Sequence, residues 1–139
     1  MIKSKYKNEK KIVAIIQARQ TSTRFPGKSL EKINNLSIIE IIVKRLKLSK
    51  FIKEIIVAIP DNKENKILFS LLRKSKIKVF KGSEEDVLTR YFEAAKKYKA
   101  EHIVRITGDC PIVDSKIVDS VINLYFNDNV DYCSNVNPA

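Results

Sequence analysis

A short apolar run, Ile12 to Ile16, ends abruptly in a basic and hydroxyl-rich segment that extends to Lys28. Five consecutive apolar residues are typical of a parallel strand that is buried on both faces. The segment that follows contains two arginines, a lysine, a serine and two threonines. A strand that delivers such a loop to its carboxyl end is the usual way in which an α/β fold holds an anionic group, often the phosphates of a nucleotide.

Segments of strand and helix character alternate along the rest of the chain. Strands are predicted at 54–59, 77–80, 102–106 and 130–134, and apolar residues recur at helical spacing within 38–46, 67–72, 87–98 and 117–125. Repeated strand–helix units predict an α/β fold, here a three-layer α/β/α sandwich around a mostly parallel, Rossmann-like sheet. Ligands of such sheets bind beyond the carboxyl ends of the strands, so we expect the loops after the first and fourth strands to share that edge.

The length and charge of the chain narrow its possible partners. Its 139 residues fit one domain, which we place at 11–139 behind a basic N-terminal tail, 1–10. The formal net charge of +11 favours anionic partners such as nucleotides, nucleic acid or anionic lipid. However, lysine is spread along the chain, and the aromatic residues lie mostly on apolar helix faces. We therefore interpret the charge as solvated surface and expect no nucleic-acid interface.

The sequence also argues against membrane, disulfide and zinc chemistry. No apolar stretch is long enough to span a membrane, and the N-terminus lacks the apolar core of a signal peptide. Cys110 and Cys133 are far apart in sequence, and His102 is the single histidine. We expect a cytoplasmic protein in which both cysteines are free thiols and His102 has no catalytic role.

The loop after the first strand has the chemistry of a phosphate site. Arg19, Arg24 and Lys28 would supply positive charge, and Ser22 and Thr23 would donate hydrogen bonds. The loop lacks the spaced glycines and the Gly-Lys-Ser/Thr ending of a Walker loop. An ordinary basic surface loop would have the same local chemistry, so the loop alone leaves both interpretations open.

An aspartate follows the fourth predicted strand. Asp109 lies just past the strand end, where a carboxylate can hold Mg²⁺ together with phosphate oxygens. The alternative is a turn aspartate that accepts hydrogen bonds from its own backbone. Asp114 is a possible second acidic group, but we prefer to interpret it as the N-cap of the last helix.

The third helix is predicted to begin with a run of acidic residues, Glu84 to Asp86. Ser83 is the predicted N-cap of this helix, with acidic residues in its first turn. Asp86 and Arg90 lie one turn apart, which is the spacing of an exposed ion pair on a helix.

Four sequence blocks occur in a fixed order along the chain. They are Gln17-Ala18-Arg19 with Ser22-Thr23-Arg24-Phe25-Pro26-Gly27-Lys28, then Gly82-Ser83-Glu84-Glu85-Asp86-Val87-Leu88 with Arg90-Tyr91, then Arg105-Ile106-Thr107-Gly108-Asp109-Cys110-Pro111, then Asp131-Tyr132-Cys133-Ser134-Asn135. Together they resemble the cytidylyltransferases that activate acidic sugars, in the branch named after spore-coat polysaccharide biosynthesis. Acylneuraminate and 3-deoxy-manno-octulosonate cytidylyltransferases are related families. The resemblance runs from about Lys11 to the end of the chain.

This resemblance implies a fold, a reaction and a set of site residues. The fold is the nucleotide-diphospho-sugar transferase sandwich, and the reaction joins CTP and a sugar acid to give a CMP-sugar and pyrophosphate. The implied catalytic residues are Arg19 and Lys28, which would hold the triphosphate, and Asp109, which would bind Mg²⁺. The implied nucleotide-binding positions are Ala18, Arg19, Ser22, Thr23, Arg24, Lys28, Gly82, Ser83, Asp86, Arg90, Thr107 and Gly108.

The chain departs from the family pattern in two places. Thr21 stands where many relatives have glycine, and threonine restricts the backbone of the loop. Relatives also continue beyond the equivalent of Asn135 with elements that bind the sugar, complete the sheet, often carry the dimer contacts and usually supply a second acidic metal ligand. The resemblance therefore implies the N-terminal part of such an enzyme, with a homodimer or a complementing C-terminal fragment as possible partners.

Other functions are compatible with the same residues. Another nucleotidyltransferase or glycosyltransferase on this fold would use UTP, GTP or a nucleotide-sugar. A non-catalytic module that binds nucleotides or nucleic acid would not depend on Asp109, and a decayed protein would fold poorly and respond to no ligand.

Overall fold

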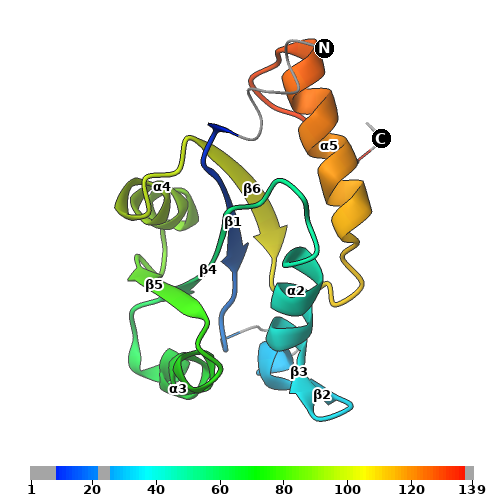
Figure 1. The fold of residues 1–139 in the computed structure, drawn as a ribbon. Helices are drawn as coiled ribbons and strands as arrows, with labels where there is room; N and C mark the ends of the chain where they lie inside the picture. The colour runs from blue at the N-terminus through cyan, green and yellow to red at the C-terminus, as the bar shows by residue number, and fades with distance from the viewer. Residues whose placement is uncertain (1–8, 22–25, 137–139) are drawn as a thin grey trace.

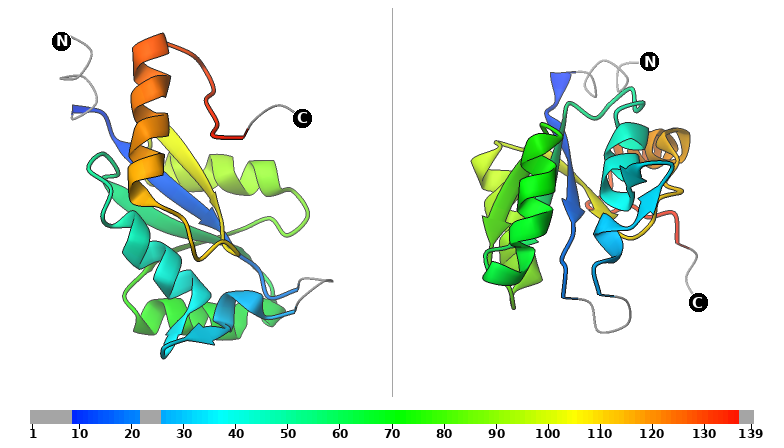
Figure 2. Two further views of the ribbon diagram at one scale, coloured as in Figure 1. Left: turned by 90° about the vertical axis from the view of Figure 1, so that its right-hand side faces the viewer. Right: turned by 90° about the horizontal axis from the view of Figure 1, so that it is seen from below.

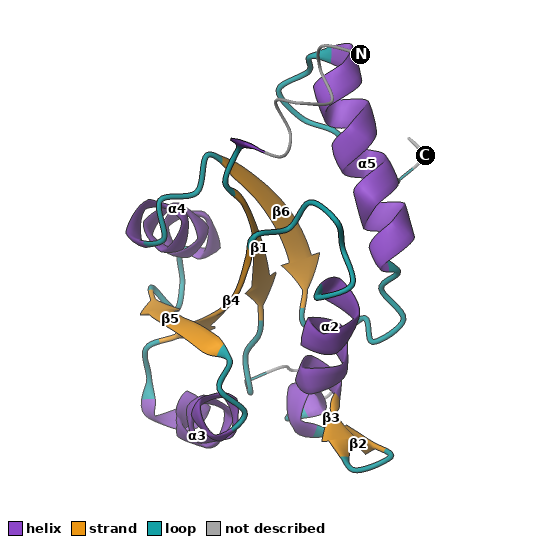
Figure 3. Cartoon of the chain, viewed as in Figure 1, coloured by secondary structure: helices purple, strands orange, loops and turns teal. Residues whose placement is uncertain are grey.

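A parallel four-stranded sheet forms the centre of the molecule. The computed structural model describes residues 9–21 and 26–136. The strands are β1 (Ile12–Gln17), β4 (Glu54–Pro60), β5 (Lys78–Gly82) and β6 (His102–Thr107). Their order is β5-β4-β1-β6, and every neighbouring pair is parallel (Figures 1 and 3). The predicted parallel sheet is therefore confirmed for the first four strands.

Helices cover the two faces of this sheet. They are α2 (Ile38–Leu46), α3 (Lys66–Lys74), α4 (Val87–Lys97) and α5 (Ser115–Asp128), with short 3₁₀ helices η1 (Lys28–Leu30) and η2 (Lys63–Asn65). Buried side chains of α2, α3 and α5 share one apolar cluster, and those of α4 belong to a second. The views in Figure 2 agree, since α2 and α5 lie on one side of the sheet and α4 on the other. The predicted three-layer sandwich is confirmed.

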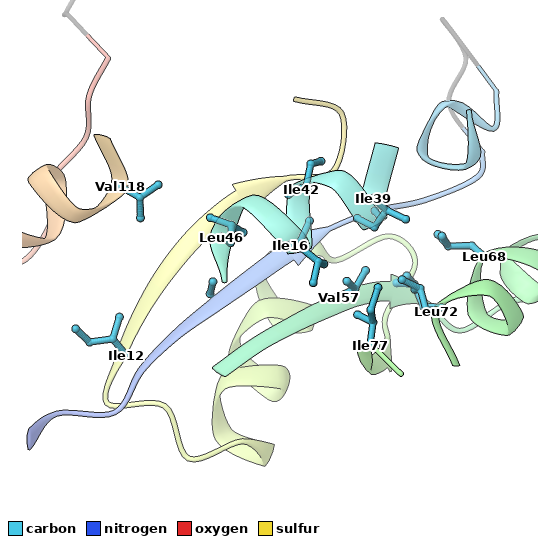
Figure 4. Packing of buried hydrophobic residues seen from close by; sticks show 14 of the residues in the cluster. Ile12, Ile16, Ile39, Ile42, Leu46, Val57, Leu68, Leu72, Ile77 and Val118 are labelled. Carbon is cyan, nitrogen blue, oxygen red and sulfur yellow. The ribbon is translucent and has the colours of Figure 1, made fainter. Parts of the chain in front are cut away.

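Strand β1 contributes to both cores, which explains its uninterrupted apolar sequence. Ile12, Ala14 and Ile16 belong to the cluster under α2, α3 and α5, whereas Val13 and Ile15 belong to the cluster under α4. All five are at most 1% exposed. Figure 4 shows Ile12 and Ile16 among the side chains of the first cluster. A strand that is covered on both faces has no position for a polar side chain.

Strand β6 is an edge strand and is only partly covered. Ile103, Arg105 and Thr107 are exposed, while the alternate residues are half-buried. A groove of about 850 Å³ runs between β6, α5 and residues 131–136. The strand predicted at 130–134 is wrong, because these residues form turns and irregular structure. High β-propensity makes a strand only where the backbone finds a neighbour to pair with.

A small hairpin that the sequence analysis missed lies before α2. Strands β2 (Lys32–Ile33) and β3 (Leu36–Ser37) are antiparallel and joined by Asn34 and Asn35, whose φ angles are 49° and 65°. Two consecutive positive φ angles are typical of a type I′ turn, for which asparagine is well suited. The Asn-Asn pair was the signal available in the sequence.

One predicted helix cap is correct and one is wrong. Asp114 caps α5 and accepts a hydrogen bond from the Lys116 amide at 2.7 Å. For α4 the N-cap is Asp86 and not Ser83, because the first helical residue is Val87. The Ser83 hydroxyl instead accepts a hydrogen bond from the Asp86 amide at 3.0 Å, which shapes the turn before the helix.

The described part of the predicted N-terminal tail is joined to the domain by an ion pair. The side chain of Lys10 pairs with Glu101 at 2.8 Å, while residues 1–8 of the predicted tail lie outside the described residues. Among the helices that the structure describes, none combines the length and apolar character needed to cross a membrane.

Helices α3 and α4 end in left-handed residues that are lysines. Lys76 and Lys99 have φ angles of 55° and 52°. After each, the next amide bonds back to the helix, from Ile77 to the Leu72 carbonyl and from Ala100 to the Ala95 carbonyl, both at 2.9 Å. This is the Schellman geometry, in which glycine is the usual left-handed residue. Lysine there adopts a disfavoured conformation.

We predict that Lys99→Gly stabilises the protein. Relief of the left-handed strain, reduced by the greater unfolded-state entropy of glycine, should raise the free energy of unfolding by about 0.5–1 kcal/mol in urea titrations. The matched control is Lys96→Gly, an exposed lysine inside α4, which should lower it by about 1 kcal/mol. Equal losses for the two variants would contradict the assigned C-cap.

Candidate functional site

The sheet topology brings the carboxyl ends of β1 and β6 side by side, where an α/β sheet of this kind is expected to hold its ligand crevice. From β1 the chain moves outward to β4 and β5, then returns to place β6 on the other side of β1. Figure 1 shows both arrows ending at the same edge, and Gln17 is level with Thr107 in the pairing. Ligands of parallel α/β sheets bind beyond the carboxyl ends of the strands, at the point where the strand order reverses.

Gly108 presses the loop after β6 against the end of β1. Its amide donates a hydrogen bond to the Gln17 carbonyl at 2.8 Å. A Cβ atom at this position would lie 2.6 Å from the same carbonyl oxygen and 2.9 Å from the Cβ of Ala18. The hydroxyl of Ser29, from the far end of the first loop, contacts the Gly108 carbonyl at 3.4 Å. The two loops are thus joined directly.

The loop after β1 is closed at its base. The Gly27 amide donates to the Gln20 carbonyl at 3.0 Å, and Gly27 has a φ of 74° that suits glycine. The Gln20 amide donates to the side-chain oxygen of Asn65 at 2.9 Å. This closure fixes the start of η1 and with it Lys28. The predicted site residues Ser22, Thr23 and Arg24 lie outside the described residues.

Lys28 and Asp109 meet across the crevice. The Nζ of Lys28 lies 2.5 Å from the Oδ2 of Asp109, and both side chains are partly exposed. The hydrogen bond from Lys28 lowers the pKa of the Asp109 carboxyl, against the opposing effect of partial burial. Two side chains that are 81 residues apart in sequence, and that the sequence assigns to one site, are therefore in contact.

Arg19 and Arg90 form a second basic element of the site. Arg19 is exposed just beyond β1, whereas Arg90 is 1% exposed. Burial lowers the pKa of the Arg90 guanidinium, and the nearby charge of Arg19 acts in the same direction. Arg90 donates to the carbonyls of Ser83 and Glu84. Its Nε has no hydrogen-bond partner among the described residues.

Arg90 therefore shapes the segment that leaves β5. Gly82 packs so closely that a Cβ there would lie 3.1 Å from the Cγ of Arg90. The Asp86 carboxylate accepts from the amide and hydroxyl of Thr89 at 2.9 and 2.6 Å. The exposed Asp86–Arg90 ion pair expected from their spacing is replaced by these contacts, because the guanidinium points inward to the loop carbonyls.

Other candidate residues lie away from the crevice or have structural roles. His102 is at the opposite end of β6 and packs edge-on against Phe126, with ring centroids 4.8 Å apart. Asp114 serves as a helix cap. Cys110 and Cys133 are free, as predicted.

Asn65 is a site residue that the sequence analysis missed. It is 1% exposed, and its side chain joins the β1 loop to the turn after β4. Its Nδ2 donates to the Oδ1 of Asn62 at 2.5 Å. Two asparagines three residues apart, directly after a predicted strand, were the available signal.

The donor set at the crevice fits a cation that is shared with a phosphate. No group of three or more His, Cys, Asp or Glu side chains within the described ranges could hold a metal ion. Asp109 offers one carboxylate, and Mg²⁺ typically combines one or two carboxylates with substrate phosphates and water. The residues present therefore fit Mg²⁺ together with a bound triphosphate.

Comparison with known proteins adds evidence that is independent of this geometry. The model of a family described as cytidylyltransferase matches residues 13–138. The spore coat polysaccharide biosynthesis protein SpsF of Bacillus subtilis is 37% identical over 125 residues, which are 87% of this chain and 52% of that protein. The chain spans about half the length of the curated relatives it matches.

Solved structures agree with the sequence comparison. A cytidylyltransferase from Leptospira borgpetersenii serovar Hardjo-bovis aligns with a TM-score of 0.79 at 38% identity, covering 85% of this chain and 50% of that one. A CMP:2-keto-3-deoxy-manno-octonic acid synthetase in complex with CTP aligns with a TM-score of 0.75 at 23% identity, covering 86% and 49%. The second likeness shows a common fold alone. The family resemblance and the fold class expected from the sequence are confirmed.

We predict that Gly108→Ala destabilises the domain. The added methyl group must displace the backbone of β1, which should lower the free energy of unfolding by about 1–3 kcal/mol in urea titrations. Cys110→Ala, an exposed change two residues away, is the control and should stay within about 0.5 kcal/mol. If Gly108→Ala were as mild as the control, the close contact of the two loops would be contradicted.

Proposed function

This chain belongs to the cytidylyltransferase family, and from that premise we propose that the crevice between β1 and β6 binds the triphosphate of CTP. The observation that carries the proposal is the meeting of Lys28 and Asp109 at the switch point of the sheet, with Arg19 exposed just beyond β1. A lysine and an arginine suit phosphate oxygens, and a single carboxylate suits a cation that those oxygens also hold.

The proposed reaction transfers CMP to an acidic sugar and releases pyrophosphate. The oxygen of a sugar hydroxyl attacks the α-phosphorus in line as the bond from that phosphorus to the bridging oxygen of pyrophosphate breaks. The hydroxyl proton leaves to solvent, and negative charge builds on the departing pyrophosphate. Arg19 and Lys28 bind and neutralise its oxygens, while Asp109 would hold Mg²⁺. The bound cation supplies charge stabilisation and orients the triphosphate. The two joined loops would lower the barrier further by holding the triphosphate in the orientation that the attack requires.

The segment from Gly82 to Arg90 forms the proposed wall of the nucleotide pocket. Arg90 holds the carbonyls of Ser83 and Glu84, so the backbone of this segment is presented in one conformation. We assign Arg90 a positioning role, since its guanidinium is buried beneath the loop. Asp86 acts as the helix cap that fixes the other end of the segment.

Backbone groups complete the proposed nucleotide contacts. Ala18, Thr107 and Gly108 lie at the two strand ends, where Gly108 packs closely against Ala18, and we assign their backbone to the floor of the proposed site. Ser22, Thr23 and Arg24 complete the loop that would surround the phosphates.

We assign binding of the sugar to the half of the relatives' length that this chain does not match. The free edge of β6 and the groove beside α5 offer a surface for further sheet and helix. A C-terminal region or a second copy would complete the enzyme there. We place the complete enzyme in the cytoplasm, in the synthesis of a surface polysaccharide.

A non-catalytic nucleotide-binding unit is the second candidate. One observation favours it: the Asp109 carboxylate is paired with Lys28 at 2.5 Å. Such a unit would bind nucleotide through its basic groups and would lose little affinity without the carboxylate.

We predict that CTP with Mg²⁺ raises the thermal stability of the chain. Nucleotide at a hundred times its dissociation constant should add about 2.7 kcal/mol to the free energy of unfolding. UTP, GTP and ATP should give smaller shifts. Asp109→Asn should reduce the CTP shift, and the matched control Asp131→Asn, an exposed carboxylate, should leave it unchanged.

The outcomes separate the two candidate functions. A CTP shift that is independent of Mg²⁺ and unchanged in Asp109→Asn favours the non-catalytic unit. A cooperative transition that no nucleotide moves would show that the described crevice is not a nucleotide site.

A further inference from the structure

Lys28 and Asp109 are partners of each other in this structure. The Nζ of Lys28 lies 2.5 Å from one carboxylate oxygen of Asp109. In the proposed function, however, the lysine binds triphosphate oxygens and the aspartate binds a divalent cation. Each side chain is therefore occupied by the other until both ligands arrive.

We propose that this ion pair couples nucleotide binding to cation binding. In the nucleotide-free protein the ammonium of Lys28 takes the place of the cation on Asp109, and an incoming triphosphate releases the carboxylate by attracting the lysine. The inference rests on the proposed function and adds its regulation: the crevice takes up a divalent cation and a nucleotide as one unit.

The backbone holds the two side chains in position to pair. Lys28 begins η1 directly after Gly27, whose amide is bonded to the Gln20 carbonyl. Asp109 follows Gly108, whose amide is bonded to the Gln17 carbonyl. The Ser29 hydroxyl also contacts the Gly108 carbonyl, so the neighbours of the two residues touch. An ion pair between anchored residues loses less side-chain entropy than one between free surface chains.

Charge explains why the cation and the lysine exclude one another. A divalent cation on Asp109 would lie within a few ångströms of the ammonium, and like charges at that separation repel strongly. The carboxylate is half-exposed and is the acid that the crevice provides. A triphosphate reverses the balance, because its negative charge attracts the lysine and adds oxygen ligands for the cation.

Coupling of this kind is reciprocal. If the nucleotide strengthens cation binding by some factor, the cation strengthens nucleotide binding by the same factor, and typical factors are about 5–150. The free protein should therefore bind bare divalent cations weakly. Removal of the lysine should remove the obstacle and leave the carboxylate available.

Mn²⁺ binding to the nucleotide-free protein tests the proposal, with free Mn²⁺ measured by electron paramagnetic resonance. Mn²⁺ takes oxygen ligands as Mg²⁺ does and is visible to the method. Lys28→Met should bind Mn²⁺ about tenfold more tightly than the wild type, within the usual range of coupling. Lys28→Gln should behave likewise and serves if the first variant does not fold. Lys28→Arg, which keeps the charge, should retain weak binding.

Two control variants separate the ion pair from general charge effects. Lys63→Met removes an exposed lysine that begins η2 and should leave Mn²⁺ affinity within about twofold of the wild type. Adding Asp109→Asn to Lys28→Met should abolish the gain. A gain that survives loss of Asp109, or that Lys63→Met reproduces, would overturn the proposal.

The wild-type CTP shift distinguishes this inference from the proposed function. Equal Mn²⁺ affinities for wild type and Lys28→Met, with CTP still stabilising the wild type, would overturn the coupling and leave the nucleotide site intact. Absence of any CTP effect, with tighter Mn²⁺ binding by Lys28→Met, would overturn the nucleotide site and with it the coupling, leaving only an exchange of lysine for cation.

Discussion

The contact between Gly108 and the end of β1 is the constraint on which the site depends. A parallel sheet brings strand ends to one edge, but loops of ordinary side chains would stand apart there. The missing side chain at Gly108 lets the β6 loop reach the Gln17 carbonyl. Lys28 and Asp109 then start from positions close enough to pair. The chemistry of the crevice follows from one close approach of two backbones.

The rest of the fold serves to hold this edge in place. Strand β1 is buried on both faces, so its carboxyl end can move little. Asn65 ties the first loop to the turn after β4, and Arg90 ties the segment after β5 to its own helix. Strand β6 is less well covered than β1, because it lies at the edge of the sheet and the side chains on one of its faces are exposed. The proposed nucleotide site thus lies on well-anchored elements, whereas β6 beside it is only partly covered.

Sequence patterns predicted the parallel sheet and the four helices, because hydrophobic periodicity reflects burial. They also predicted that the loops after β1 and β6 share one edge. The sequence patterns did not predict features that depend on contacts between distant segments, such as strand pairing and the hydrogen-bond partners of buried side chains. Residues 130–134 have β-propensity but no neighbouring strand to pair with. The N-cap of α4 is Asp86 and not Ser83, because the first hydrogen bonds of a helix, which the sequence does not show, decide where it starts. The carbonyl partners of Arg90 were not predictable, since no motif identifies the backbone groups that a buried guanidinium binds. For Asn65 the spacing from Asn62 indicated a turn but not its contact with the Gln20 amide.

The most direct test of the account is to locate CTP on the protein by NMR. Amide shifts would be followed in ¹⁵N-labelled protein as CTP and Mg²⁺ are added. Binding of the triphosphate at Lys28 and Asp109 should give the largest shifts at Gly27, Lys28, Gly108 and Asp109, with smaller ones from Gly82 to Asp86. Shifts that cluster instead along α5 and the outer edge of β6 would contradict it, because they would place the nucleotide in the groove that we assign to polypeptide.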